Sequence, residues 1–114
     1  MLKRGTIVLI PFPFTDLSSQ RVRPVVVVSG DHRAGNDVIV VFISSVLTGR
    51  IGNTEVVIRD VHPLFPDTGL KVSSVLKCDK IATLDRRIMI GELGHLPAVF
   101  QKDVDARLRE VLGL

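Results

Sequence analysis

The sequence predicts a small, mainly β barrel with a C-terminal α-helix, in one domain over residues 1–114. Its apolar segments are short, rich in Val and Ile, and separated by turn residues, which is the pattern of an antiparallel β protein. Two of them, residues 25–28 and 38–43, are continuous apolar runs, which is typical of strands covered on both faces. Near the C-terminus the apolar residues recur at helical spacing instead.

Seven short strands are expected from these segments. They are residues 6–12, 25–29, 38–44, 55–58, 74–77, 79–83 and 89–93. We expect the sheet to close on itself, because closure removes strand edges that would otherwise lie unpaired. Pro24 lacks an amide donor, so it is expected to begin its strand and to place Arg23 at the rim of the sheet. A rim arginine beside a polar loop is a candidate anion contact, and an ordinary solvated arginine is the alternative.

The C-terminal helix is predicted from four apolar residues at helical spacing. They are Val104, Leu108, Val111 and Leu112. Pro97 precedes the pattern and Gly113 follows it as a stop signal. A helix of about three turns shields only part of one sheet face. A second subunit, in a homodimer, is therefore expected to cover more of the apolar surface.

The composition is that of a folded protein outside the membrane. Apolar residues make up 46% and charged residues 24% of the chain. No run approaches the roughly 18 apolar residues of a membrane span, and Pro11 and Pro13 interrupt the apolar N-terminal run that might otherwise resemble a signal peptide. Cys78 is the only cysteine, which excludes an internal disulfide and a cysteine-based zinc site. A reduced, cytoplasmic location is the natural inference.

The charge balance is mildly basic. Fifteen Lys and Arg against twelve Asp and Glu give a net charge of +3, which is compatible with a nucleic-acid partner but does not establish one. The chain has no Trp and no Tyr, which weakens any interpretation based on aromatic stacking of bases.

Common catalytic and metal-binding patterns are missing from the sequence. His32, His62 and His95 form no His-x-x-x-His pair and have no carboxylate at a recognisable ligand spacing. No Gly-x-Ser-x-Gly, Gly-x-Gly-x-x-Gly or Walker-type motif is present. We therefore expect neither a metal nor a cofactor.

What remains is a set of polar residues at the ends of predicted strands. They are Arg23, the pair Ser44 and Ser45, and the run Lys77, Cys78, Asp79 and Lys80. Strand alternation sends Lys77 and Asp79 to one face and Cys78 to the other. A carboxylate flanked by cations can act as general base on an RNA 2′-hydroxyl, while the cations stabilise charge on the phosphate. The alternative is a cross-strand salt bridge on a solvated face, which spacing alone favours.

Four blocks of the chain occur in a recognisable order and spacing. They are Arg4-Gly5, Arg23-Pro24 with the valines 25–28, the strand end 41–45, and residues 77–85. Together they resemble the MazF/PemK (Kid-like) toxins of bacterial type II toxin-antitoxin modules, nearly from end to end. The second block alone would be a weak match, and its order with the other three makes the resemblance specific.

The resemblance implies an SH3-like antiparallel β-barrel with a C-terminal helix (the CcdB/MazF-like fold) and a homodimer. It also implies a metal-independent endoribonuclease that cuts single-stranded RNA, chiefly mRNA, at short preferred sequences and inhibits growth. The products would be 2′,3′-cyclic phosphate and 5′-hydroxyl ends. The protein partner would be a cognate antitoxin whose acidic, disordered tail competes with RNA for Arg23 and Lys80.

The resemblance also assigns roles to individual residues. Arg23 corresponds to the phosphate-binding arginine, and Asp79 to the carboxylate that serves as base in Kid-type members. Ser44 stands where the family usually has a catalytic-site threonine, and Lys77 where it has an arginine proposed as the acid. The expected substrate-binding residues are Arg21, Ser45, Lys80 and Asp16.

Three positions depart from the family pattern. Ser44 keeps the hydroxyl of the usual threonine, Lys77 keeps a positive charge without the planar guanidinium fork, and Ala82 replaces an arginine found in many relatives. Two alternative functions stay open at this point. One is a CcdB-like toxin that cleaves nothing and acts on a protein such as DNA gyrase through its C-terminal helix. The other is an inactive dimeric binding module, which Lys77 and Ala82 would support.

Overall fold

The computed structural model describes residues 2–11, 22–31 and 34–114, and within them six strands and one α-helix. The strands are β1 (Thr6–Pro11), β2 (Val22–Val27), β3 (Asp37–Ser44), β4 (Glu55–Ile58), β5 (Ser74–Asp85) and β6 (Gly91–His95), and the helix is α1 (Ala98–Leu112). Two 3₁₀ helices, η1 (Phe65–Thr68) and η2 (Arg86–Ile88), lie before and after β5. No helix in the described ranges has the length and apolar character needed to cross a membrane.

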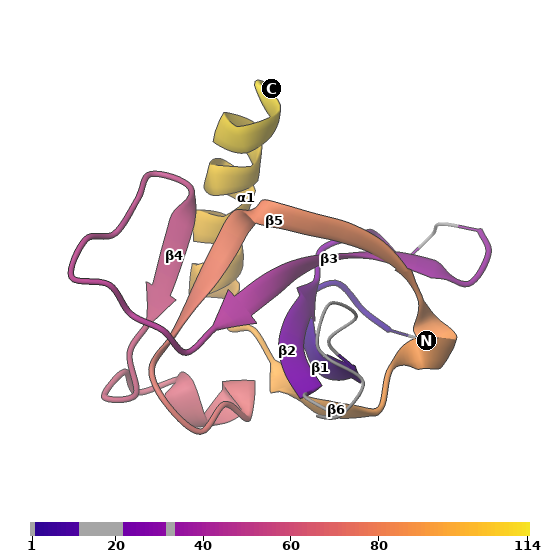
Figure 1. The fold of residues 1–114 in the computed structure, drawn as a ribbon, viewed down its shortest axis with the longest axis horizontal. Helices are drawn as coiled ribbons and strands as arrows, with labels where there is room; N and C mark the ends of the chain where they lie inside the picture. Colours follow the sequence, from indigo (N-terminus) through magenta and orange to yellow (C-terminus); the bar gives the residue numbers. More distant parts are fainter. Residues whose placement is uncertain (1, 12–21, 32–33) are drawn as a thin grey trace.

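All six strands belong to one antiparallel sheet in the order β4-β5-β3-β2-β1-β6. Figure 1 shows that this sheet curls into a half-barrel, with α1 packed across β4 and β5. The predicted mainly β fold with a C-terminal helix is confirmed. The sheet curls without closing, however, and in the described part of the chain β4 and β6 each pair along one edge only.

A bulge in β5 joins two strands that were predicted to be separate, 74–77 and 79–83. The β3–β5 register passes directly from Val41 opposite Ile81 to Phe42 opposite Lys77. Residues 78–80 of β5 are therefore extra residues that are not paired with any residue of β3. An insertion of this kind bends a strand and increases its twist, and Figure 1 shows the resulting bend in β5.

The prediction that Pro24 begins its strand is wrong, because β2 begins two residues earlier, at Val22. The carbonyl of Val27 accepts a hydrogen bond from the Gly5 N–H on the β1 side, so alternation turns position 24 toward β3. The β2–β3 register covers only the positions from Val25 onward, so no donor is needed at Pro24. Arg23 consequently lies inside β2, half-buried and opposite Ile10, and not at the rim outside the strand.

The valine run of β2 is buried on both faces, as the continuous apolar pattern predicts. Val26 belongs to the cluster between the sheet and α1, together with Leu76 and Phe100. Val25 and Val27 belong to a second cluster inside the curl of the sheet. Each of the three valines is at most 1% exposed, and burying a side chain of this size stabilises a fold by about 1.5–3 kcal/mol.

The predicted C-terminal helix is confirmed between Pro97, its N-cap, and Gly113, whose left-handed conformation ends it. Val104 is buried in the core, and Leu108 and Val111 pack against it. Leu112 does not join them, because it is 58% exposed near the end of the helix that extends beyond the sheet in Figure 1. The homodimer stays a prediction.

Gly69 supplies a testable constraint on the fold. It ends η1 with φ +70°, and a Cβ at this position would overlap the carbonyl oxygen of Leu93, just where η1 contacts β6. Gly69→Ala is expected to lower the free energy of unfolding by about 2–3 kcal/mol, through backbone strain and displacement of β6. Gly49→Ala is the matched control, because nothing lies within 4 Å of its Cβ position. Equal urea-unfolding midpoints for the two variants would contradict this account.

Candidate functional site

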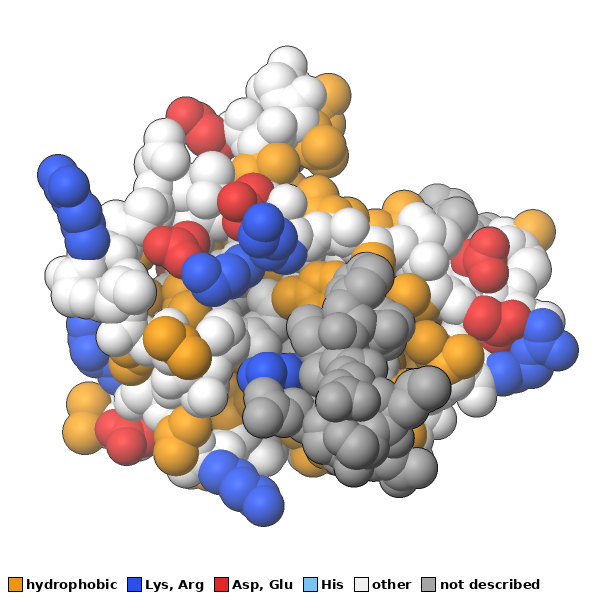
Figure 2. Space-filling model, viewed as in Figure 1, with side chains coloured by type: hydrophobic (Ala, Val, Ile, Leu, Met, Phe, Trp, Pro, Cys, Tyr) orange, Lys and Arg blue, Asp and Glu red, His pale blue; other side chains and the backbone are white. Residues whose placement is uncertain are grey.

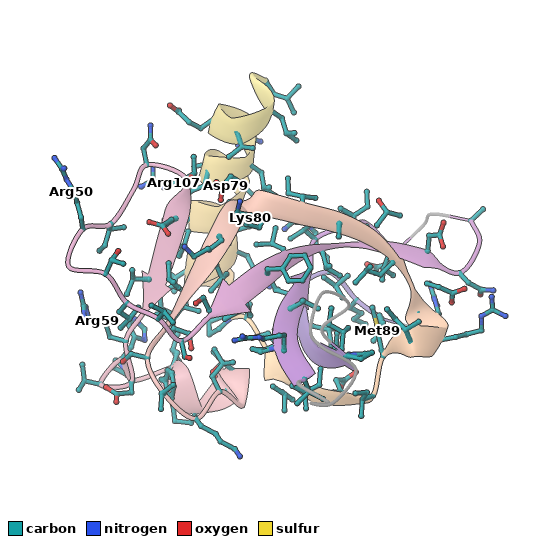
Figure 3. The ribbon with its side chains drawn as sticks, in the orientation of Figure 1. Arg50, Arg59, Asp79, Lys80, Met89 and Arg107 are labelled. Carbon is teal, nitrogen blue, oxygen red and sulfur yellow. The ribbon has the colours of Figure 1, made fainter. Side chains whose placement is uncertain are left out.

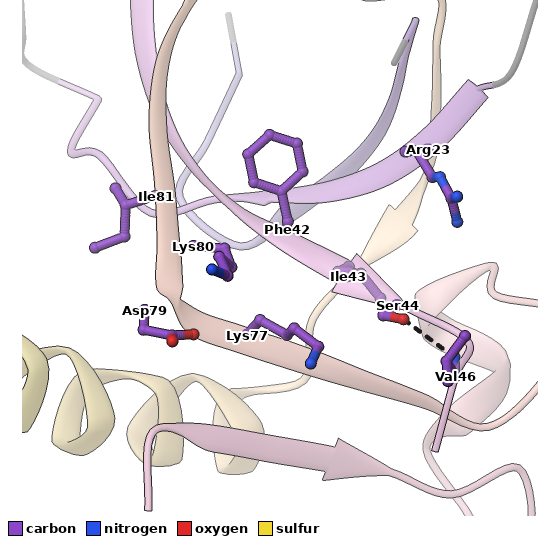
Figure 4. A pocket seen from close by; sticks show the side chains of 9 residues that line it. All are labelled: Arg23, Phe42, Ile43, Ser44, Val46, Lys77, Asp79, Lys80 and Ile81. Atoms are coloured by element: carbon purple, nitrogen blue, oxygen red, sulfur yellow. Dashed lines mark hydrogen bonds between the residues drawn. The ribbon is translucent and has the colours of Figure 1, made fainter. Parts of the chain in front are cut away.

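The bulge in β5 opens a pocket of about 510 Å³ where β2, β3 and β5 meet. Figure 4 shows its lining side chains, which come from these three strands and, for Val46, from the turn after β3. The lining residues are Arg23, Phe42, Ile43, Ser44, Val46, Lys77, Asp79, Lys80 and Ile81. The pocket therefore combines an apolar floor with charged and hydroxyl groups at its margin.

Five of the residues that the sequence singled out are brought together here. They are Arg23, Ser44, Lys77, Asp79 and Lys80. Ser45 is exposed beyond the end of β3 and does not line the pocket. Arg21 and Asp16 lie outside the described residues. Phe42 was not predicted as a site residue, although it precedes Ser44 by two positions and strand alternation places the two on the same face.

The bulge directs its three residues differently. Cys78 is fully buried, whereas Asp79 and Lys80 are exposed at the pocket, as alternation predicted for Cys78 and Asp79. The Cys78 N–H donates to the carbonyl of Thr54 at 3.0 Å, so β5 stays attached to the segment before β4 where its pairing with β3 is interrupted. Burial raises the pKa of the Cys78 thiol to about 11, which keeps the thiol neutral and unreactive.

Lys77 forms the salt bridge that spacing favoured, but with a partner that was not foreseen. Its Nζ lies 3.2 Å from Oε2 of Glu55, the residue directly opposite on β4, so the salt bridge is cross-strand as expected. Glu55 Oε1 also accepts a hydrogen bond from the Gly52 N–H at 2.8 Å. The Gly52 N–H and then the Lys77 ammonium lower the pKa of Glu55. Glu55 thus holds the Lys77 ammonium at the pocket margin.

Ser44 is oriented by the turn that follows β3. Its Oγ accepts a hydrogen bond from the Val46 N–H at 3.1 Å, the dashed line in Figure 4. Because the hydroxyl acts as acceptor in this bond, its own hydrogen stays available for donation to a ligand oxygen. The serine that replaces the usual family threonine therefore keeps the hydrogen-bonding capacity that a phosphate contact needs.

The pocket is positively charged overall. Arg23, Lys77 and Lys80 oppose the single carboxylate of Asp79 among the lining residues. Figure 2 shows basic side chains near the middle of this face, with acidic ones close by. Even with Lys77 neutralised by Glu55, the remaining cations and the Ser44 hydroxyl provide donors for the oxygens of a phosphodiester.

Ala82 lies outside this pocket. It packs, half-buried, against the core cluster inside the curl of the sheet. The absent family arginine therefore leaves the five polar lining residues of the pocket unchanged.

The described histidines take structural positions. His62 packs against the Phe100 ring and its Nδ1 accepts from the Leu64 N–H, whereas His95 contacts Gln101. His32 lies outside the described residues. Across residues 2–11, 22–31 and 34–114 no group of three or more His, Cys, Asp or Glu could hold a metal ion.

The fold and the pocket together define a small β half-barrel with a basic, carboxylate-containing site on a bulged strand. The chain belongs to the family of PemK-like, MazF-like toxins of type II toxin-antitoxin systems, whose model matches residues 3–112. This finding confirms the resemblance seen in the sequence. Among curated proteins, none is similar enough in sequence to match the chain.

Solved structures share the fold at low sequence identity. An endoribonuclease in complex with its cognate antitoxin, from a mycobacterial species, aligns with TM-score 0.77 and 21% identity, over 100% of this chain and 97% of that one. MazF from Deinococcus radiodurans aligns with TM-score 0.73 and 24% identity, over 99% and 97%. The Mycobacterium tuberculosis toxin MazF-mt6 aligns with TM-score 0.71 and 21% identity, over 96% and 97%. At these identities the likeness establishes the fold.

The Glu55–Lys77 pair predicts a pH-dependent coupling. Because the pKa of Glu55 is lower in the folded protein, the pair stabilises the fold above about pH 4.3, the ordinary glutamate value, and this stability is lost as pH falls through the folded-state pKa. A double-mutant cycle with Glu55→Gln and Lys77→Gln is expected to give an interaction free energy of at most about 1 kcal/mol at pH 7, since the pair is partly exposed. Urea unfolding of the four proteins at pH 7 and at pH 3 measures this interaction free energy. An equal interaction free energy at the two pH values would contradict the assignment of the lowered Glu55 pKa to this pair.

Proposed function

We propose that this protein is a toxin that cleaves single-stranded RNA, chiefly mRNA, without a metal, and that the bulge pocket is its active site. The observation that carries the proposal is that Arg23, Ser44 and Asp79, from three different strands, line one positively charged pocket. Membership of the toxin family supports the same function. A toxin that acted only by binding a protein target would not need these groups in one pocket.

The proposed reaction is attack of an RNA 2′-hydroxyl on the adjacent phosphorus. Asp79 accepts the proton of the 2′-hydroxyl, and the new bond from the 2′-oxygen to phosphorus forms as the bond to the 5′-oxygen breaks. Arg23 and Lys80 stabilise the charge that develops on the non-bridging oxygens, and Ser44 donates a hydrogen bond to one of them. Lys77 donates a proton to the leaving 5′-oxygen. The products are a 2′,3′-cyclic phosphate and a 5′-hydroxyl.

The proposed partners follow from the family and its structural neighbours. One neighbour is described as an endoribonuclease in complex with its cognate antitoxin, and another as a MazE-MazF complex. We propose that this chain is likewise neutralised by a cognate antitoxin that competes with RNA for the basic pocket. The toxin would act in the cytoplasm as a homodimer, and cleavage of mRNA would inhibit growth.

Cleavage of a long single-stranded RNA in excess EDTA tests this function. The unmodified protein is expected to give discrete fragments with cyclic phosphate ends. Asp79→Asn removes the base and Arg23→Gln removes a phosphate contact, and each is expected to lower kcat/KM by about 100-fold or more. Lys102→Gln, on the exposed side of α1, is the matched control and is expected to keep full activity. Intact RNA after incubation with folded protein, on several RNAs, would reject the nuclease in favour of the non-catalytic alternatives.

Lys80 is predicted to contribute to affinity through charge alone. Binding of a non-cleavable 2′-O-methyl oligonucleotide should weaken as salt rises, and Lys80→Gln should reduce the slope of log K against log salt by about 0.7, the value for one phosphate contact on a single strand. Fluorescence anisotropy at several salt concentrations measures both slopes. An unchanged slope in Lys80→Gln would exclude Lys80 from the phosphate contacts.

A further inference from the structure

A second cavity, of about 490 Å³, lies between β4 and α1. None of its lining residues lines the bulge pocket. We call it the β4–α1 groove and define it by Val57, Arg59 and Val61 on the β4 side and Phe100, Asp103 and Arg107 on α1. The three α1 residues follow one face of the helix at spacings of three and four.

The β4 wall of the groove is the edge of the sheet. The carbonyl of Thr54 accepts from the Cys78 N–H, so the backbone groups of Thr54, and by alternation those of Val56 and Ile58, face β5. The N–H and C=O of Val57 must therefore face away from β5. In the described part of the chain no strand pairs with this outer edge, and such an edge is a template for an added strand.

Two guanidinium groups border the groove. Figure 3 shows Arg107 near one end of β4 and Arg59 near the other. Neither forms an ion pair with another described residue, and the Nε of Arg107 is buried without a hydrogen-bond partner in that part of the structure. A carboxylate in the groove would pair with the guanidinium groups of these two arginines.

The acidic groups at the groove do not cancel this charge. The Glu55 carboxylate also borders the cavity, but Lys77 and the Gly52 N–H already engage it. Asp103 is therefore the remaining carboxylate against two arginines. Most of the other lining residues are apolar, although His62, whose ring packs on the buried Phe100, also lines the cavity. Val61 is the most accessible of the apolar ones, with a highly exposed side chain.

We propose that the β4–α1 groove binds an extended, acidic peptide segment of a protein partner as an additional strand on β4. Backbone hydrogen bonds to Val57 set the register, carboxylates of the peptide pair with Arg59 and Arg107, and an apolar side chain packs against the exposed Val61. A peptide fits better than RNA, because RNA would use neither the strand edge nor the apolar wall. The proposal goes beyond the RNA-cleaving function and does not depend on it.

The test is an NMR titration of the full-length ¹⁵N-labelled protein with a defined probe, an acetylated and amidated hexapeptide of alternating Glu and Val. Chemical-shift changes are expected at the Val57 amide and the Arg107 Nε–H. Arg107→Gln should weaken binding about two- to five-fold, and Asp103→Asn should tighten it by a similar factor, the range for one exposed charge pair. Arg109→Gln, an exposed arginine that does not line the groove, is the control and should bind as the unmodified protein does.

A backbone variant separates strand addition from simple charge attraction. Val57→Pro removes an N–H that faces away from β5, so it should leave the β4–β5 pairing intact and abolish binding of the acidic probe. The unfolding midpoint confirms that this variant is folded, and Arg107→Gln tests the proposal independently if it is not. The proposal would be overturned if a Lys-Val hexapeptide bound equally well. It would also be overturned if the chemical-shift changes were confined to the bulge pocket, or if none appeared at millimolar probe. Stronger changes at the same amides with a single-stranded oligonucleotide would overturn it in favour of nucleic acid.

Discussion

The loss of register between β3 and β5 is the constraint on which the proposed active site depends. Residues 78–80 of β5 are not paired with any residue of β3, and this insertion bends the strand. As a result Cys78 is buried, whereas Asp79 and Lys80 are exposed at the pocket. A regular ladder would have used these positions for pairing. The hydrogen bond from Cys78 to Thr54 holds the other side of the bulge. The site is therefore built by a fixed irregularity between two well-packed strands and not by a separate loop.

The pairing of β5 with its other neighbour, β4, affects the charge of the pocket. Register places Lys77 opposite Glu55, so one cation of the pocket is shared with β4 before any ligand arrives. A ligand phosphate must compete with Glu55 for Lys77, whereas Lys80 has no such partner among the described residues. Glu55 also borders the β4–α1 groove, and its engagement with Lys77 leaves the arginines there opposed by Asp103 alone.

Much of this structure could be predicted from sequence, for physical reasons that particular residues show. The valine run of β2 is buried on both faces as its continuous apolar pattern requires, and α1 ends at Gly113. The sequence predicted an interruption at Cys78 between two strands, but the bulge within one continuous strand could not be foreseen, because only the partner strand reveals the shift in register. The start of β2 was misplaced because the pairing of β2 with β3 begins only at Val25, so Pro24 needs no donor on that side although β3 itself continues to Ser44. Glu55 was missed because its contact with Lys77 joins two strands far apart in sequence.

The central claim is that the bulge pocket is where single-stranded RNA binds. Its most direct test is an NMR map of the contacts of a non-cleavable 2′-O-methyl oligonucleotide on the full-length protein. We expect the largest chemical-shift changes at Arg23, Ser44 and the bulge residues 78–80, and no changes in η1 and β6. Changes centred elsewhere, with the bulge residues silent, would contradict it.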